Sequence, residues 1–187
     1  WSIDPGKSSW FFDKKRAGMG AMADLGIHKT DLIQYLLDTT VAETRAFVGT
    51  LDKKDAVGNF IGVDDNAICI YTMNNGIVGT MTASWSYYGE EDNSTVLYGT
   101  EGIMKIYSNP QFAIEIITKD AEKVLYDIDK IQTNDNQTKS GIIDAFVESI
   151  VKNEEPVISG KSVLSAMRAV FASIEASECG HTVKIRQ

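Results

Sequence analysis

Residues 64–86, DDNAICIYTMNNGIVGTMTASWS, decide the fold class, because a tight-turn signal separates two strand-like runs. Apolar residues, many of them β-branched, recur through 64–73 and 77–86, a pattern typical of strands. Asn74-Asn75-Gly76 between them are residue types that tolerate the positive φ angles of a primed hairpin turn. A link this short makes neighbouring strands antiparallel, so the stretch predicts an antiparallel hairpin.

Elements on both sides of this hairpin complete an α+β pattern. We expect helices over about 19–37, 141–153 and 162–179, and a polar connection over 129–140. Further strand-like runs occur at 42–50, 94–99, 102–107, 112–118, 122–127 and 182–186. This order predicts two layers, a predominantly antiparallel or mixed β-sheet with helices packed on one face. Because residues 67–71 are apolar on both alternations, we expect a second subunit or another domain to cover the open face of the sheet.

Length and charge bound the class of protein. A chain of 187 residues with 43% hydrophobic residues is long enough for one domain with a sizeable core. The balance of 18 basic and 26 acidic residues gives a net charge of −8, which argues against a nucleic-acid or anionic-membrane surface. The sequence has no membrane-span run and no signal-peptide pattern, and it opens on Trp1 rather than Met, so we expect it to be part of a longer protein. Cys69 and Cys179 show neither metal-ligand spacing nor a disulfide framework, which favours a reducing cytoplasm.

The first expected helix carries a candidate acid/base pair. Steps of four, three and four residues place Asp24, His28, Asp31 and Tyr35 on one helical stripe. A carboxylate one turn from an imidazole can hold one tautomer and stabilise the protonated ring, as proton transfer near neutral pH requires. The spacing alone fits an ordinary pair on a helix surface equally well. Lys29 falls on the apolar side of this helix, where it would either snorkel or meet a carboxylate.

A series of motifs runs in order along nearly the whole chain. The motifs are Trp10, Gly18-x-Gly20-Ala-x-x-Asp24-Leu-Gly26-x-His28-x-x-Asp31-Leu, Gly79-Thr80, Ala83-Ser84-Trp85, Gly99-Thr-Glu-Gly102, Phe146, Pro156-Val-Ile-Ser-Gly160 and Gly180-His-Thr-Val-Lys-Ile185. Together they resemble the C-terminal domain of the Gfo/Idh/MocA family of oxidoreductases. The resemblance implies that residues 1–187 form a single substrate-binding and oligomerisation domain of a two-domain oxidoreductase. Family members bind NAD or NADP on a separate N-terminal Rossmann domain, which also supplies a lysine in a Glu-Lys-Pro motif, and this chain has neither.

By the same resemblance, His28 would be the acid/base group or a ligand of a substrate hydroxyl, and Asp24 would orient it or bind the substrate. Asp31 is explained equally well by hydrogen bonding on the helix surface.

Four further residues are candidates for the wall of the substrate pocket. Aromatic faces suit sugar or cyclitol rings, and arginine suits hydroxylated or acidic groups. Core packing or surface charge explains each of the four at least as well. The four candidates are Trp10, Arg16, Trp85 and Tyr87.

The glycines at the start of the helix superficially match a dinucleotide fingerprint, Gly18-x-Gly20-x-x-Ala23. That fingerprint must follow a buried strand, and here it follows Asp13-Lys-Lys-Arg-Ala, so we expect no cofactor-binding residues in this chain. We expect instead that the glycines let the backbone approach the substrate. Asp24, His28 and His181 match no recognised zinc spacing, so we expect no metal site.

The resemblance therefore implies the C-terminal domain of an NAD(P)-dependent dehydrogenase that acts on a CH–OH group of a sugar, cyclitol or related polyol. We expect the domain alone to be inactive, because the cofactor performs the hydride transfer. The alternative is a non-catalytic dimerisation or ligand-binding module. A stand-alone hydrolase is disfavoured, because no serine or cysteine nucleophile motif is present.

Overall fold

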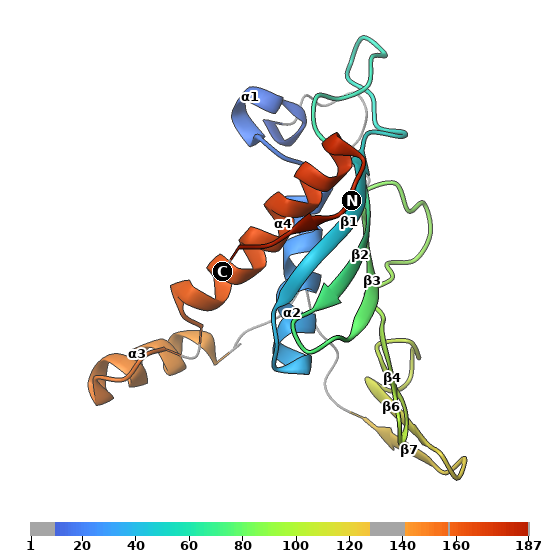
Figure 1. Ribbon diagram of the computed structural model, residues 1–187, viewed down its shortest axis with the longest axis vertical. Helices are drawn as coiled ribbons and strands as arrows, with labels where there is room; N and C mark the ends of the chain where they lie inside the picture. The colour runs from blue at the N-terminus through green and yellow to red at the C-terminus, as the bar shows by residue number, and fades with distance from the viewer. Residues whose placement is uncertain (1–9, 128–140, 157, 187) are drawn as a thin grey trace. The chain divides into compact units, whose positions relative to one another are not determined.

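The α+β class is confirmed by the computed structural model, which describes residues 10–127, 141–156 and 158–186 (Figure 1). The strands form two four-stranded antiparallel sheets, ordered β3-β2-β1-β8 and β4-β5-β6-β7, rather than the single sheet that we expected. The chain divides into two compact units, one made of residues 1–88 and 149–187 and the other of residues 89–148. The expected polar connection over 129–140 lies outside the described residues.

The sheet of the first unit is built around the predicted hairpin. In that hairpin Thr72 pairs with Val78, and Gly76 has the positive φ of 85° that the turn requires. At the edge of the sheet, Lys184 of β8 pairs with Glu43 of β1. The strands of this sheet are β1 (Val41–Gly49), β2 (Asn66–Met73), β3 (Val78–Ser84) and β8 (Val183–Lys184).

Helices α2 (Ile27–Leu37) and α4 (Gly160–Cys179) lie on one face of this sheet (Figure 1). Strand alternation places Ala67, Cys69 and Tyr71 of β2 on that inner face, where they are buried. Met22 and Val170 of the helical layer complete the same core.

Buried hydroxyl groups tie the helices to the sheet. The Tyr71 hydroxyl lies 3.0 Å from Thr30 Oγ1 on α2, and Thr30 in turn donates to the carbonyl oxygen of Gly26. Ser173 of α4 lies 3.1 Å from Thr44 Oγ1 on β1. These bonds satisfy polar groups that would be costly to bury alone, so they fix how the helical layer sits on the sheet.

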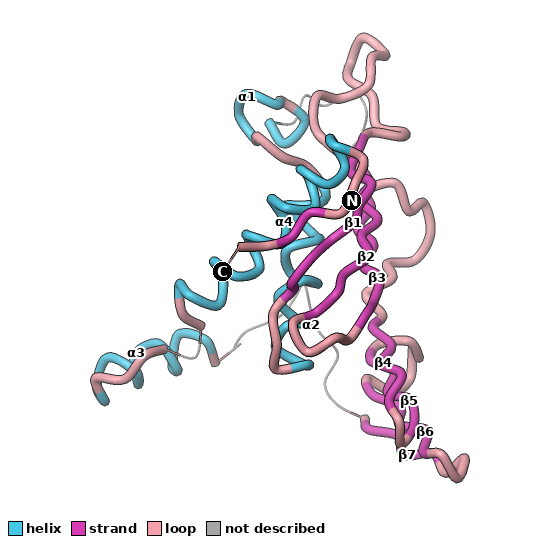
Figure 2. The backbone as a smooth tube through the Cα atoms, in the orientation of Figure 1, coloured by secondary structure: helices cyan, strands magenta, loops and turns pink. Residues whose placement is uncertain are grey.

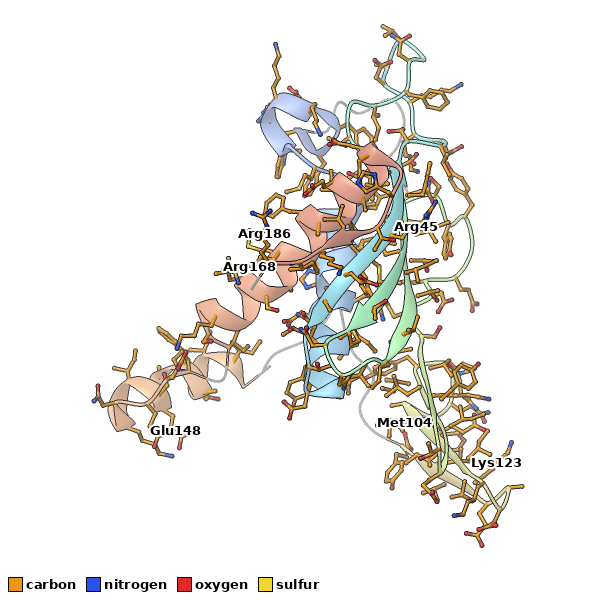
Figure 3. The ribbon with its side chains drawn as sticks, viewed as in Figure 1. Arg45, Met104, Lys123, Glu148, Arg168 and Arg186 are labelled. Carbon is orange, nitrogen blue, oxygen red and sulfur yellow. The ribbon has the colours of Figure 1, made fainter. Side chains whose placement is uncertain are left out.

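The opposite face of this sheet carries exposed apolar side chains among polar ones. Phe47 pairs with Ile68, and Arg45 pairs with Ile70, all four with exposed side chains. Arg45 is labelled on β1 in Figure 3. This is the open face that the sequence predicted.

Helical structure covers residues 21–37, close to the expected range of 19–37, but its first full turn is irregular. Two short elements come first, η1 (Trp10–Phe12) and α1 (Lys14–Ala17). Gly18 then ends α1 with a φ of 76°. The next turn, Met22–Gly26 (η2), is π-helical and leads directly into α2. A single π-helical turn is rare and often marks a functional site.

The second unit contains the other sheet, a meander joined by short loops (Figure 2). Lys105 on β5 and Lys123 on β7 both pair with Glu115 on β6, at 3.9 and 3.4 Å. Helix α3 (Ile142–Lys152) crosses the boundary between the two units. The strands are β4 (Thr95–Gly99), β5 (Gly102–Ile106), β6 (Ile114–Thr118) and β7 (Lys123–Tyr126). None of the helices in the described residues is long and apolar enough to cross a membrane.

Candidate functional site

Asp64 fixes the start of the helical segment that carries the candidate acid/base pair. Its Oδ1 accepts a hydrogen bond from the Gly20 N–H and its Oδ2 accepts one from the Met22 N–H, each at 2.7 Å. Its carbonyl oxygen accepts from the Ala21 N–H at 2.9 Å. N–H groups at a helix start lack partners within the helix and favour a negative charge, so Asp64 meets both needs. Sequence reasoning missed this residue, because it counted Asp64 as the first residue of the expected strand over 64–73, whereas β2 begins at Asn66.

The same contacts correct the expected role of Gly20. A Cβ on Gly20 would lie 1.8 Å from the carbonyl oxygen of Asp64. The backbone that Gly20 approaches is therefore that of Asp64, and the expectation of close approach to a substrate is wrong for this residue. Because the Gly20 and Met22 N–H groups already donate to Asp64, they are not available to a cofactor phosphate.

Asp24 lies in the π-helical turn and contacts Trp85, which directly follows β3. Trp85 Nε1 donates to Asp24 Oδ2 at 3.0 Å. The indole is only 5% exposed, because Phe11 and Phe12 pack against it with ring centroids 6.4 and 5.9 Å away. The structure therefore brings two predicted site residues together, and it places Trp85 beneath the surface.

His28 lies in the first turn of α2 and its side chain is exposed. Asp31 and Tyr35 are exposed as well, whereas Thr30 and Gln34 on the opposite side of α2 are buried. The predicted stripe therefore faces outward from α2. Within the described residues, the Asp24 carboxylate accepts its side-chain hydrogen bond from Trp85 rather than from His28.

The other predicted wall residues lie at the surface of the first unit. Trp10 is 48% exposed and stacks on Phe11 with ring centroids 4.2 Å apart. Since Phe11 also contacts Trp85, aromatic rings run from the exposed Trp10 to the partner of Asp24. Arg16 on α1 is exposed, and Tyr87 is 60% exposed.

Asp65 is a second acidic residue that sequence reasoning missed. Its buried carboxylate accepts hydrogen bonds from the N–H groups of Leu51, Asp52 and Lys53, at 2.8, 2.9 and 2.6 Å. Asn66 Nδ2 donates to it at 2.7 Å. Burial alone would raise the pKa of Asp65, but these hydrogen bonds stabilise the ionised form and together hold the pKa below its ordinary value. Asp65 thus anchors the loop that follows β1.

The remaining candidate groups are possible metal ligands and the second histidine, His181. Among the described residues, no group of three or more His, Cys, Asp or Glu side chains is placed to hold a metal ion. His181 follows the end of α4, where its Nδ1 lies 3.0 Å from the carbonyl oxygen of Cys179.

The fold and these residues define a class of protein, an α+β domain that presents an aspartate and a histidine at a helix start. A family model described as the GFO/IDH/MocA C-terminal domain matches residues 1–105. The chain belongs to this family, and the resemblance noted in the sequence is confirmed.

Curated proteins similar to this chain include a levoglucosan dehydrogenase. Levoglucosan dehydrogenase from Pseudarthrobacter phenanthrenivorans is 30% identical over 120 residues, which cover 54% of this chain and 31% of that enzyme. The chain therefore spans about a third of the length of this curated relative.

Solved structures share the fold. An oxidoreductase domain protein from Kribbella flavida superposes with a TM-score of 0.82 at 19% identity, covering 100% of this chain and 57% of that chain. A levoglucosan dehydrogenase in complex with NADH and levoglucosan gives a TM-score of 0.82 at 22% identity, covering 100% of this chain and 56% of that chain. At these identities the likeness establishes the fold alone.

Proposed function

We propose that this chain is the substrate-binding part of an NAD(P)-dependent dehydrogenase that oxidises a CH–OH group of a sugar, cyclitol or related polyol. The observation that carries the proposal is the exposed His28 one turn beyond Asp24, whose carboxylate is held at the start of the helix by Trp85. Family membership and the similarity to levoglucosan dehydrogenase support the substrate class.

In the proposed reaction, this chain handles the hydroxyl group of the substrate. His28 accepts the hydroxyl proton on a ring nitrogen, since neutral imidazole is a base near neutral pH. Asp24 accepts a hydrogen bond from a substrate hydroxyl or from the imidazole. The nicotinamide cofactor supplies the acceptor for the hydride that leaves the same carbon.

We propose that the cofactor is bound by an N-terminal Rossmann domain outside this chain. The occupied N–H groups at Gly20 and Met22 support this division, because they offer no cradle for the cofactor phosphates. The chain alone is then inactive. The cysteine usage supports a cytoplasmic location for the intact enzyme.

We propose that three exposed residues, Trp10, Arg16 and Tyr87, hold the remainder of the substrate. The exposed ring of Trp10 offers a flat surface for a sugar ring, and Arg16 offers hydrogen-bond donors to hydroxyl groups. Trp85 contributes through Asp24 rather than through an exposed ring.

A second candidate function is a non-catalytic dimerisation or ligand-binding module. The observation that favours it is a group of exposed apolar side chains on the open face of the first sheet, with Phe47 opposite Ile68. Homo-oligomerisation through this face is compatible with both functions, so the reaction itself has to discriminate between them.

The discriminating experiment measures NAD⁺ and NADP⁺ reduction by the intact protein with a panel of levoglucosan, hexoses, inositols and glycerol. The dehydrogenase proposal predicts turnover with at least one of these polyols and none with the isolated chain. If the intact protein binds a polyol but reduces neither cofactor, the binding-module function holds instead.

A further inference from the structure

Trp85 differs from the other predicted site residues because its ring is nearly covered but carries one polar group. Indole Nε1–H can only donate a hydrogen bond, and a buried donor without an acceptor is costly. The acceptor is Asp24 Oδ2, at 3.0 Å. One hydrogen bond therefore satisfies Trp85 and fixes one oxygen of Asp24.

The surroundings of Trp85 make it a rigid support. Its backbone N–H donates to the carbonyl oxygen of Asp65 at 2.9 Å, directly beyond the end of β3. Phe11 and Phe12 pack against its ring, and the buried Val63 belongs to the same cluster. Because these contacts restrict the indole, the direction of its N–H bond is set before any ligand arrives.

Asp24 itself needs such a support. It lies in a π-helical turn, and within the described residues Trp85 is the only side chain that hydrogen bonds to its carboxylate. The bond engages Oδ2 and leaves Oδ1 for a hydroxyl group or an imidazole. A carboxylate free to rotate would spend part of its time in unproductive rotamers.

We propose that Trp85 is a positioning residue that holds the Asp24 carboxylate in the orientation needed for catalysis. This inference rests on the proposed function. Trp85 then contributes to kcat through its hydrogen bond to Asp24, rather than through core packing or direct contact with the substrate.

The first test compares Trp85→Phe with Val41→Ala, a substitution in the core away from Trp85, in the intact protein. Trp85→Phe keeps an aromatic ring but removes the donor, so kcat for the polyol falls about tenfold to a hundredfold, as expected for a lost hydrogen bond to a charged group. KM for the nicotinamide cofactor stays unchanged. Val41→Ala removes packing from the core beside the hairpin turn, where Val41 pairs with Met73, and leaves the cluster around Trp85 intact, so it lowers thermal stability and leaves kcat within about twofold of wild type.

Should Trp85→Phe fail to fold, 3-benzothienylalanine at position 85 makes the same test. This amino acid keeps the two-ring shape and replaces the N–H group with sulfur.

A double-mutant cycle with Asp24→Ala separates positioning from a structural role. Positioning through Asp24 predicts that removing the indole N–H has no further effect on kcat once Asp24 is alanine. An equal fold-loss in both backgrounds, or wild-type kcat for the single variant, overturns the inference and leaves the proposed function standing. Absence of turnover by the wild-type protein on the whole polyol panel overturns both.

Discussion

Gly20 is held in a position where no other residue fits. A Cβ at Gly20 would overlap the carbonyl oxygen of Asp64, and this neighbour is backbone, which cannot rotate away. We expect Gly20→Ala to destabilise the protein by at least about 2 kcal/mol, because the backbone must shift to relieve the clash. Gly79→Ala is the matched control, since a Cβ there meets nothing within 4 Å. Denaturant unfolding of both variants checks the prediction, and equal stabilities would contradict it.

The hydrogen bonds to the Asp65 carboxylate predict how the free energy of unfolding depends on pH. Its pKa is lowered in the folded state, so its contribution to the free energy of unfolding is complete above the ordinary aspartate pKa of about 3.9 and is lost as the pH falls through the folded-state pKa. Asp65→Asn places an NH₂ group against backbone donors and costs about 1–3 kcal/mol at pH 7.

Unfolding curves between pH 7 and pH 3 test this assignment. The stability difference between wild type and Asp65→Asn narrows below about pH 4. Asp120→Asn serves as the control, because Asp120 is exposed. Its free energy of unfolding stays close to that of wild type at every pH. A difference that does not change with pH would show that the carboxylate charge is not what stabilises the loop.

At the scale of elements, most strands and the three long helices could be predicted from the sequence. The Asn74-Asn75-Gly76 turn and the alternation in 64–73 each carry a local signal, and local signals determined β2 and β3. The π-helical turn at 22–26 could not be predicted, because it depends on how Asp64 holds the backbone of Gly20 and Met22. Contacts between residues 42–44 positions apart leave no periodicity in the sequence.

In the candidate site, too, features with a local sequence signal could be predicted, whereas features that depend on contacts distant in the sequence could not. Asp24 and His28 were found from helical spacing and family resemblance, and the outward face of α2 follows from the burial of Thr30 and Gln34. The bond between Trp85 and Asp24 joins residues 61 positions apart, so only the fold reveals it. The burial of Trp85 likewise depends on Phe11 and Phe12, which come from a short element without a clear pattern.

At the scale of the whole molecule, the exposed face of the first sheet predicts self-association. Phe47 and Ile68 are paired on neighbouring strands and both are exposed, so a charge at either position would be buried in an interface between subunits. We expect Phe47→Asp and Ile68→Asp to shift the intact protein to a smaller assembly.

Size-exclusion chromatography with light scattering measures this shift. Val57→Asp is the control, because Val57 is exposed in the loop after β1 and belongs to no strand of that sheet. A monomeric wild-type protein, or an unchanged mass for both sheet variants, would rule out oligomerisation through this face.

The central claim, that the imidazole of His28 moves a hydroxyl proton, is tested most directly by polyol turnover in the intact protein with each histidine replaced in turn. Loss of a general base predicts that His28→Ala lowers kcat by about 10²–10⁴-fold. His181→Ala removes the other histidine of the chain, at the end of α4, and keeps the wild-type rate. A wild-type rate for His28→Ala would contradict the account.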